Sequence, residues 1–186
     1  AAISQLREEL AAAQKQAAQN TNQLARISAE LEAERMAAGL VAMTGPGLVV
    51  QLDESTMAAT ATGSAAESYI IHEYDLRDVV NLLWAGGAEA VAVNDERLVN
   101  TTSIYCVGST IMVNDTRLSP PYEVRAIGDA QRLLRWLEDP LYLTLLRQRV
   151  KAYGVQMRIA QATSVTVPAY SGTFKVRYSH AGEVTP

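Results

Sequence analysis

The sequence predicts an α+β protein in which a long N-terminal coiled-coil helix precedes a ferredoxin-like (β-α-β-β-α-β) domain with an inserted β-hairpin. Apolar residues step by three and four along the first 38 residues, and only two helical patterns follow among five or more strand patterns. A doubly wound parallel sheet is the alternative, and it fits less well because it needs more helices for that many strands. We expect a coiled-coil helix at 1–38, the α+β domain at 39–170 and an edge strand with a tail at 171–186.

Composition excludes several classes of protein. The 186 residues carry a net charge of -4 with scattered Lys and Arg, so the chain has no electrostatic footprint for nucleic acid. One cysteine cannot form an internal disulfide framework. No apolar run reaches the roughly 18 residues that span a bilayer. Because the chain starts at Ala1 rather than at methionine, we expect a processed or shortened form.

The N-terminal stretch has the period of a coiled coil. Its apolar seam keeps a 3.5-residue repeat, and neither proline nor glycine occurs before Gly39. Asn20 at a seam position favours one register and one partner number. We therefore expect a homodimer, and the alternative is an amphipathic helix folded back on its own domain. The expected dimer seam consists of Ile3, Leu6, Leu10, Ala13, Ala17, Asn20, Leu24, Ile27 and Leu31.

The first half of the domain centres on a helix that feeds directly into a strand. A turn at 44–47 leads to a first strand at 48–52, and the small polar residues of 53–68 indicate a mobile loop. Asp75 is expected to cap a helix that ends at Gly86 and Gly87. The apolar run 88–93 then predicts a buried strand, and 102–107 with 109–113 predicts a hairpin around Gly108.

The second half repeats this order. A strand at 123–127 precedes a second helix that Asp129 caps, and Asp139-Pro140 indicates that the helix restarts there with Leu141 and Leu145 on its buried face. Alternation at 155–160 predicts a strand that 165–167 extends or repeats. Phe174, Val176 and Tyr178 alternate with basic residues, which predicts one further edge strand.

No residues form a recognisable catalytic set. His72, Glu73 and Asp75 come closest, but Asp75 is expected to cap a helix, and one histidine beside one carboxylate is too few for a metal site. Cys106 lies between two apolar residues of an expected strand, so we expect a buried small side chain. His180 is expected to be solvated. We expect no enzyme activity, no cofactor and no metal.

A groove near the central helix is the candidate binding surface. Trp84 offers a stacking face, and nearby polar residues would bind a peptide or glycan. The alternative is that these polar residues hydrogen-bond turns and helix ends within the fold. The candidate groove residues are Asn81, Trp84, Glu89, Asn94 and Arg97.

Several segments resemble a known bacterial family over residues 40–170. They are MTGPGLVVQLDES, IIHEYDLRDVVNLLWAGGAEAVAVNDERL, TTSIYCVGSTIMVNDTRLSPPYEVRAIGD and TVPAY. In order and spacing they resemble the YlxW-like family, an uncharacterised family also known as domain of unknown function 881. The resemblance implies no catalytic residues. It implies a single-pass membrane protein with an upstream anchor, a coiled coil and an extracytoplasmic globular domain, in bacteria where these genes often lie near division genes.

We therefore expect a non-enzymatic, membrane-tethered scaffold or interaction protein of the bacterial cell envelope, with a partner in the envelope or the division machinery. The alternative is an extracytoplasmic module that binds a small ligand or glycan.

Overall fold

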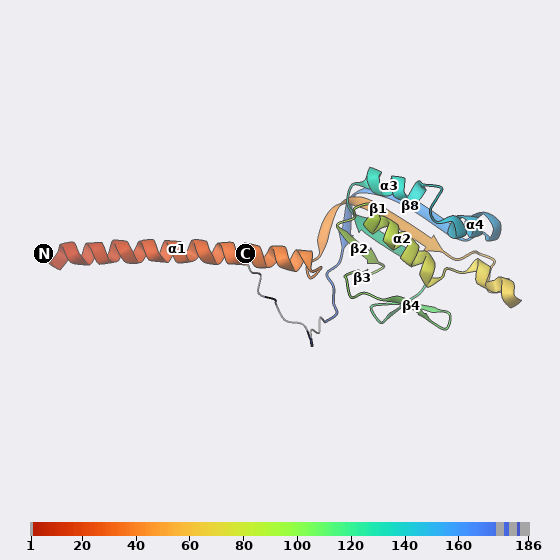
Figure 1. The fold of residues 1–186 in the computed structure, drawn as a ribbon, viewed down its shortest axis with the longest axis horizontal. Helices are drawn as coiled ribbons and strands as arrows, with labels where there is room; N and C mark the ends of the chain where they lie inside the picture. The colour runs from red at the N-terminus through yellow and green to blue at the C-terminus, as the bar shows by residue number, and fades with distance from the viewer. Residues whose placement is uncertain (1, 174–176, 179–181, 183–186) are drawn as a thin grey trace. The chain divides into compact units, whose positions relative to one another are not determined.

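The computed structural model describes residues 2–173, 177–178 and 182, and the chain divides into two compact units, 1–40 and 41–186. The protein is α+β, with an N-terminal helix and antiparallel sheets (Figure 1). His180 lies outside the described residues, and so do residues 174–176 of the expected edge strand.

The first unit is one long helix, α1 (Ala2–Ala37). At about 1.5 Å per residue, its 36 residues span about 54 Å. Gly39 adopts a φ of 77°, and its N–H donates to the carbonyl of Met36 while Leu40 N–H donates to the carbonyl of Arg35. Because glycine reaches this left-handed conformation without strain, α1 ends there, as expected from the sequence.

The second unit is organised around a five-stranded sheet with the order β3-β2-β7-β1-β8. Every neighbouring pair in this sheet is antiparallel, so the alternative of a doubly wound parallel sheet is wrong. The strands of this sheet are β1 (Met43–Asp53), β2 (Ala90–Val93), β3 (Glu96–Arg97), β7 (Tyr122–Ile127) and β8 (Gln156–Val167).

The strand β1 pairs on both sides and includes residues that were expected to form a turn. Gly45, Pro46 and Gly47 lie inside β1, and the register with β8 shifts between the two glycines. A Cβ at Gly47 would lie 1.9 Å from the carbonyl oxygen of Ala126 in β7. The glycine therefore allows two backbones to approach closely, and a bulge accommodates the sequence that resembled a turn.

Helix α2 (Glu73–Ala85) begins two residues before the expected cap. His72 is the N-cap residue, and Asp75 lies in the first turn, where its carboxylate accepts a hydrogen bond from the backbone N–H of His72 at 2.9 Å. A side chain inside the helix thus provides the hydrogen-bond acceptor for the N–H of the N-cap residue. At the other end Gly87, with φ of 89°, donates to Trp84 and closes α2 as expected.

The expected hairpin is part of a second, three-stranded sheet with the order β4-β5-β6. Gly108, with φ of 61°, joins the first two strands, and Asn114 and Asp115, also at positive φ, join the last two. The third strand was not expected because it is only three residues long. The strands are β4 (Ile104–Val107), β5 (Thr110–Val113) and β6 (Thr116–Leu118).

The second helical region consists of α3 (Ala130–Glu138) and α4 (Thr144–Tyr153). Asp129 caps α3 as expected, and its carboxylate accepts from two backbone N–H groups. The expected restart at Asp139-Pro140 is wrong, because Leu143 adopts φ of 52° and α4 begins after it. This shift changes which face is buried: Leu141 and Leu145 are 78% and 67% exposed.

The segment expected to be a mobile loop contains two 3-10 helices, η1 (Ala58–Thr60) and η2 (Gly63–Tyr69). Ser55 before them is buried, and its N–H donates to the carbonyl of Tyr69, which closes the segment on itself.

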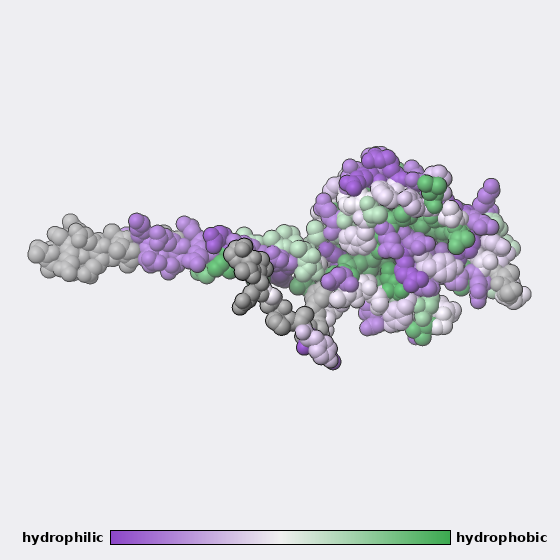
Figure 2. Space-filling model, viewed as in Figure 1, coloured by the Kyte–Doolittle hydropathy of each residue, from purple (hydrophilic) through white to green (hydrophobic). Residues whose placement is uncertain are grey.

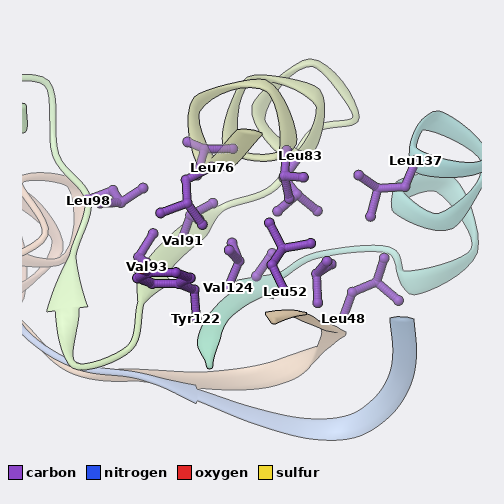
Figure 3. Close-up of a cluster of buried hydrophobic side chains, with 14 of the residues drawn as sticks. Leu48, Leu52, Leu76, Leu83, Val91, Val93, Leu98, Tyr122, Val124 and Leu137 are labelled. Carbon is purple, nitrogen blue, oxygen red and sulfur yellow. The ribbon is translucent and has the colours of Figure 1, made fainter. Parts of the chain in front are cut away.

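The main core lies between the five-stranded sheet and the helices α2, α3 and α4. Leu83 of α2 and Leu137 of α3 lie over Leu52 and Leu48 of β1, and Leu76 of α2 lies over Val91 of β2 (Figure 3). These side chains are fully buried, and each contributes roughly 1.5–3 kcal/mol to folding. The three helices are therefore held on the same face of the sheet.

We predict that Gly47→Ala destabilises the protein by more than about 2 kcal/mol, because the new methyl group meets backbone rather than a movable side chain. Gly45→Ala is the matched control, since its Cβ would meet only the Cγ2 atom of Ile127, at 2.9 Å. Urea unfolding measures both. Equal losses in the two variants would contradict the close approach of β1 to β7.

Candidate functional site

A pocket of about 630 Å³ opens where α2 begins, and it gathers the residues that the sequence singled out for chemistry. His72, Glu73 and Cys106 line it, together with Tyr74 and Arg149. A volume of this size falls in the range of small-molecule sites. The chemistry that this pocket supports depends on the hydrogen bonds and ion pairs that its polar side chains already form.

Asp75 beneath this pocket forms an ion pair with Arg149 of α4. The two side chains are 2% and 11% exposed, and the guanidinium also donates to the carbonyl of Ile70 at 2.9 Å. The second carboxylate oxygen of Asp75 accepts from the N–H of His72. Each carboxylate oxygen of Asp75 therefore has a partner, and the cation beside it favours the ionised carboxylate, so Asp75 is a structural ion-pair residue.

The aromatic rings at the pocket edge are stacked. The rings of His72 and Tyr74 lie 4.9 Å apart and nearly parallel, and the guanidinium of Arg149 lies 5.5 Å from the centre of the Tyr74 ring. Nε2 of His72 is 2.8 Å from the carbonyl oxygen of Glu67. The imidazole is therefore held in place by the carbonyl of Glu67 and by its stack on Tyr74.

Cys106 is exposed, so the expectation of a buried cysteine is wrong. Its thiol donates to a carboxylate oxygen of Glu73 at 3.2 Å. Partial desolvation in the pocket and this hydrogen bond raise the pKa of the Cys106 thiol. Because the thiolate is the nucleophile, this arrangement keeps the group in its unreactive form.

The described residues contain no group of three or more His, Cys, Asp or Glu side chains placed to hold a metal ion. The pocket can therefore bind through shape, aromatic faces and a few hydrogen bonds. The thiol of Cys106 and the carboxylate of Glu73 meet there, but their hydrogen bond favours the protonated thiol over the nucleophilic thiolate.

The five candidate groove residues do not form one surface. Asn81 and Trp84 line the same hollow beside α2. Glu89 is exposed at the start of β2, and Asn94 forms a turn in which its side chain accepts from the N–H of Glu123. For Asn94, the alternative reading of a residue that hydrogen-bonds a turn fits the geometry.

Arg97 is only 4% exposed and lies away from Trp84. Its guanidinium donates to the carbonyls of Val41 and Pro168, at 3.2 and 3.1 Å, and burial lowers its pKa. These carbonyls belong to the segment that enters β1 and the segment that leaves β8. Arg97 therefore ties together the two ends of the domain's chain.

Three adjoining hollows of about 230, 270 and 300 Å³ run along the helix side of the domain. The first and second share Asn81, and the second and third share Tyr142. Figure 2 shows hydrophobic surface here between hydrophilic stretches of α2, α3 and α4. We call this surface the aromatic belt; its principal residues are Asn81, Leu82, Trp84, Arg132, Arg135, Trp136, Leu141 and Tyr142.

Sequence reasoning found Asn81 and Trp84 but missed the rest of the belt. Trp136 and Tyr142 stack with ring centres 5.6 Å apart, and Leu141 is exposed beside them. The sequence analysis assigned Leu141 to a buried helix face because Asp139-Pro140 resembled a helix start. The left-handed residue Leu143 changes that phase, and leucine is not a residue type that signals it.

The expected dimer seam lies on α1. The side chains of Ile3, Leu6, Ala13 and Ala17 fall outside the described ones. Leu10, Leu24, Ile27 and Leu31 are 48% to 65% exposed, and Asn20 accepts from the side chain of Gln16. Over the residues that the structure describes, no helix is both long enough and apolar enough to cross a membrane.

Comparison with known proteins gives a family. A family model described as "Bacterial protein of unknown function (DUF881)" matches residues 30–180. The chain is 38% identical to "UPF0749 protein YlxW" of Bacillus subtilis (strain 168) over 105 residues, which is 56% of this chain and 45% of the relative. It is 35% identical to "UPF0749 protein Rv1825" of Mycobacterium tuberculosis (strain ATCC 25618 / H37Rv) over 160 residues, covering 83% and 50%.

The chain spans about half the length of the curated relatives it matches. Among solved structures it is similar to an uncharacterized conserved protein from Mycobacterium tuberculosis, with a TM-score of 0.63 and 29% identity. That match covers 82% of this chain and 99% of the other.

We predict that Arg149→Met destabilises the protein by about 3 kcal/mol, because it leaves the carboxylate of Asp75 buried without its cation. Lys151→Met, on the exposed side of the same helix, is the control and should change stability by less than about 0.5 kcal/mol.

The double variant Asp75→Asn with Arg149→Met should lose less than the sum of the single losses, since neither side chain then carries a charge. Urea unfolding of the wild type, of Asp75→Asn, of Arg149→Met and of the double variant gives these free energies of unfolding. Additive losses would show that the pair is not coupled.

Proposed function

Because the chain belongs to the bacterial family of proteins of unknown function described as DUF881, whose model covers 30–180, we propose that it is a non-enzymatic interaction protein. Its long helix pairs with a second copy, and its globular domain presents a binding surface to a partner. The observation that carries this proposal is the row of exposed leucine and isoleucine side chains on α1.

An isolated helix with such a row is unfavourable in water. The apolar side chains at the seam spacing are 48% to 65% exposed; they are Leu10, Leu24, Ile27 and Leu31. Two helices that pack these side chains as knobs into holes remove them from water, and Asn20 fixes the register. A parallel or an antiparallel pair would bury the same row.

We further infer that the domain behind α1 is ferredoxin-like. Four strands in the order β2-β7-β1-β8, all antiparallel, with helices connecting β1 to β2 and β7 to β8, support this assignment. The sheet β4-β5-β6 is then an insertion between the second and third strands of that unit. Such a sheet with helices on one face is a rigid platform for binding.

The cellular setting belongs to the same proposal. An anchor upstream of this chain, a position outside the cytoplasm and a partner in the cell envelope or division machinery are what the family resemblance implies. A dimeric helix between a membrane and a domain would present two copies of the binding surface at once, which raises their effective affinity.

A second candidate function is the binding of a small ligand or glycan in the pocket at the start of α2. Its volume of about 630 Å³ and the stacked rings of His72 and Tyr74 favour this reading. Sugars and other partly apolar ligands bind against such ring faces.

We predict that the full chain sediments as a dimer and that Leu24→Asp raises the dimer dissociation constant at least about 100-fold, because it places a carboxylate in an apolar seam. Ala29→Asp adds the same charge at an exposed position outside the seam and is the control. A wild-type chain that remains monomeric at all concentrations would contradict the coiled coil.

For the second candidate, soluble cell-wall fragments should raise the melting temperature of the chain, and His72→Ala should remove the effect because it deletes one stacked ring. Tyr178→Ala removes an aromatic residue far along the chain, which is 96% exposed, and is the control. Stabilisation that persists in His72→Ala would rule out this pocket as the binding site.

A further inference from the structure

The aromatic belt has the composition of a protein-binding hot spot. It contains Trp84 and Trp136, the only two tryptophans of the chain, together with Tyr142 and exposed Leu141. Tryptophan, tyrosine and arginine are the residues that most often contribute large binding energies at interfaces. Exposed side chains of this size stay in water at a free-energy cost, which a partner would remove.

The charges at one end of the belt are unbalanced. Arg132 and Arg135 flank Trp136 in the third hollow, and neither forms an ion pair with any described residue. The acidic residue of that hollow, Asp139, uses a carboxylate oxygen to accept from the N–H of Leu141 at 2.9 Å. Two guanidinium groups and one carboxylate give this end of the belt a net charge of +1 (2 − 1), on a chain whose net charge is -4.

The rest of the belt is mainly apolar or already paired. Arg77 in the first hollow forms an ion pair with Glu73 at 3.4 Å. Leu82, Leu141 and Leu143 line the middle hollow, with Asp78 at its edge. Cationic groups therefore stand at the third hollow, and apolar groups extend from it toward Trp84.

We infer that the aromatic belt is the docking site of a protein partner whose contact segment presents an acidic side chain beside bulky apolar ones. The acidic side chain pairs with Arg132 and Arg135, and the apolar side chains cover Tyr142 and Leu141. This inference rests on the proposed function, because it names the partner chemistry for the surface that the dimer presents.

The geometry favours a peptide segment over a small molecule. Each hollow is shallow and holds only about 230–300 Å³, whereas together they form a row that shares lining residues. A small molecule would occupy one hollow and leave the apolar side chains of the other two in water. A segment of several residues can follow the row and place side chains in successive hollows.

The test uses a phage-displayed library of random 16-residue peptides selected on the full chain, since the partner is identified only by its chemistry. Selected peptides are synthesised and titrated onto the chain while tryptophan fluorescence is recorded. Peptides are synthesised with Phe in place of any Trp, so that the tryptophan signal comes from the chain, whose two tryptophans both line the belt.

We expect selected peptides to carry Asp or Glu beside Trp, Phe or Leu and to shift tryptophan emission. The double variant Arg132→Glu with Arg135→Glu should weaken binding at least about tenfold, because it puts like charges together. Leu141→Asp should do the same. Arg158→Glu, on an exposed position of β8, should stay within about twofold of the wild-type chain.

Two outcomes of the peptide selection would overturn the inference: a selection that yields no peptide sensitive to the belt variants, or peptides that bind equally well after Lys replaces their acidic residues. The Leu24→Asp chain separates this result from the proposed dimer. Unchanged peptide binding in that chain supports the inference even if α1 does not pair. Binding that is lost with the dimer would show that the belt of a single chain is not sufficient to bind the segment, and would overturn the inference.

Discussion

The buried ion pair between Asp75 and Arg149 is the interaction on which the helix side of the domain depends. It connects the first turn of α2 to α4, and Arg149 also holds the carbonyl of Ile70 just before α2. Since separating the charges would leave one of them buried alone, the two helices keep a fixed relation. The aromatic belt is lined from α2 and from the α3 to α4 region, so its shape depends on this pair.

The same interaction explains why the acidic and histidine residues near α2 are poor candidates for catalysis. Asp75 is committed to Arg149 and to the N–H of His72, and the thiol of Cys106 is held protonated beside Glu73. Asp75 and Cys106 are thus engaged with groups of the protein itself. The aromatic belt, in contrast, offers aromatic and apolar surface together with Arg132 and Arg135, which form no ion pair with a described residue.

The sequence predicted where helices and strands lie better than it predicted which other parts of the chain they contact. Asp129, Gly87 and the alternation of β8 were sufficient because capping and period are local effects. Gly45 to Gly47 read as a turn, and only pairing on both sides shows why they form a strand. Leu143 has a left-handed backbone, and leucine is not a residue type that predicts this conformation. The exposure of Leu141 could therefore not be predicted from the sequence. The candidate groove failed for a related reason: Asn94 and Arg97 are near Trp84 in sequence but point to other parts of the sheet.

We propose that the chain acts by binding a partner through the helix side of its domain. The most direct measurement is photo-crosslinking in living cells, with benzoylphenylalanine placed at position 141 in the belt, 109 at the pocket edge, or 158 on β8 of the full-length protein. We predict discrete protein adducts from position 141 and none from the other two. Adducts that form only at position 109, or none at position 141, would contradict the account.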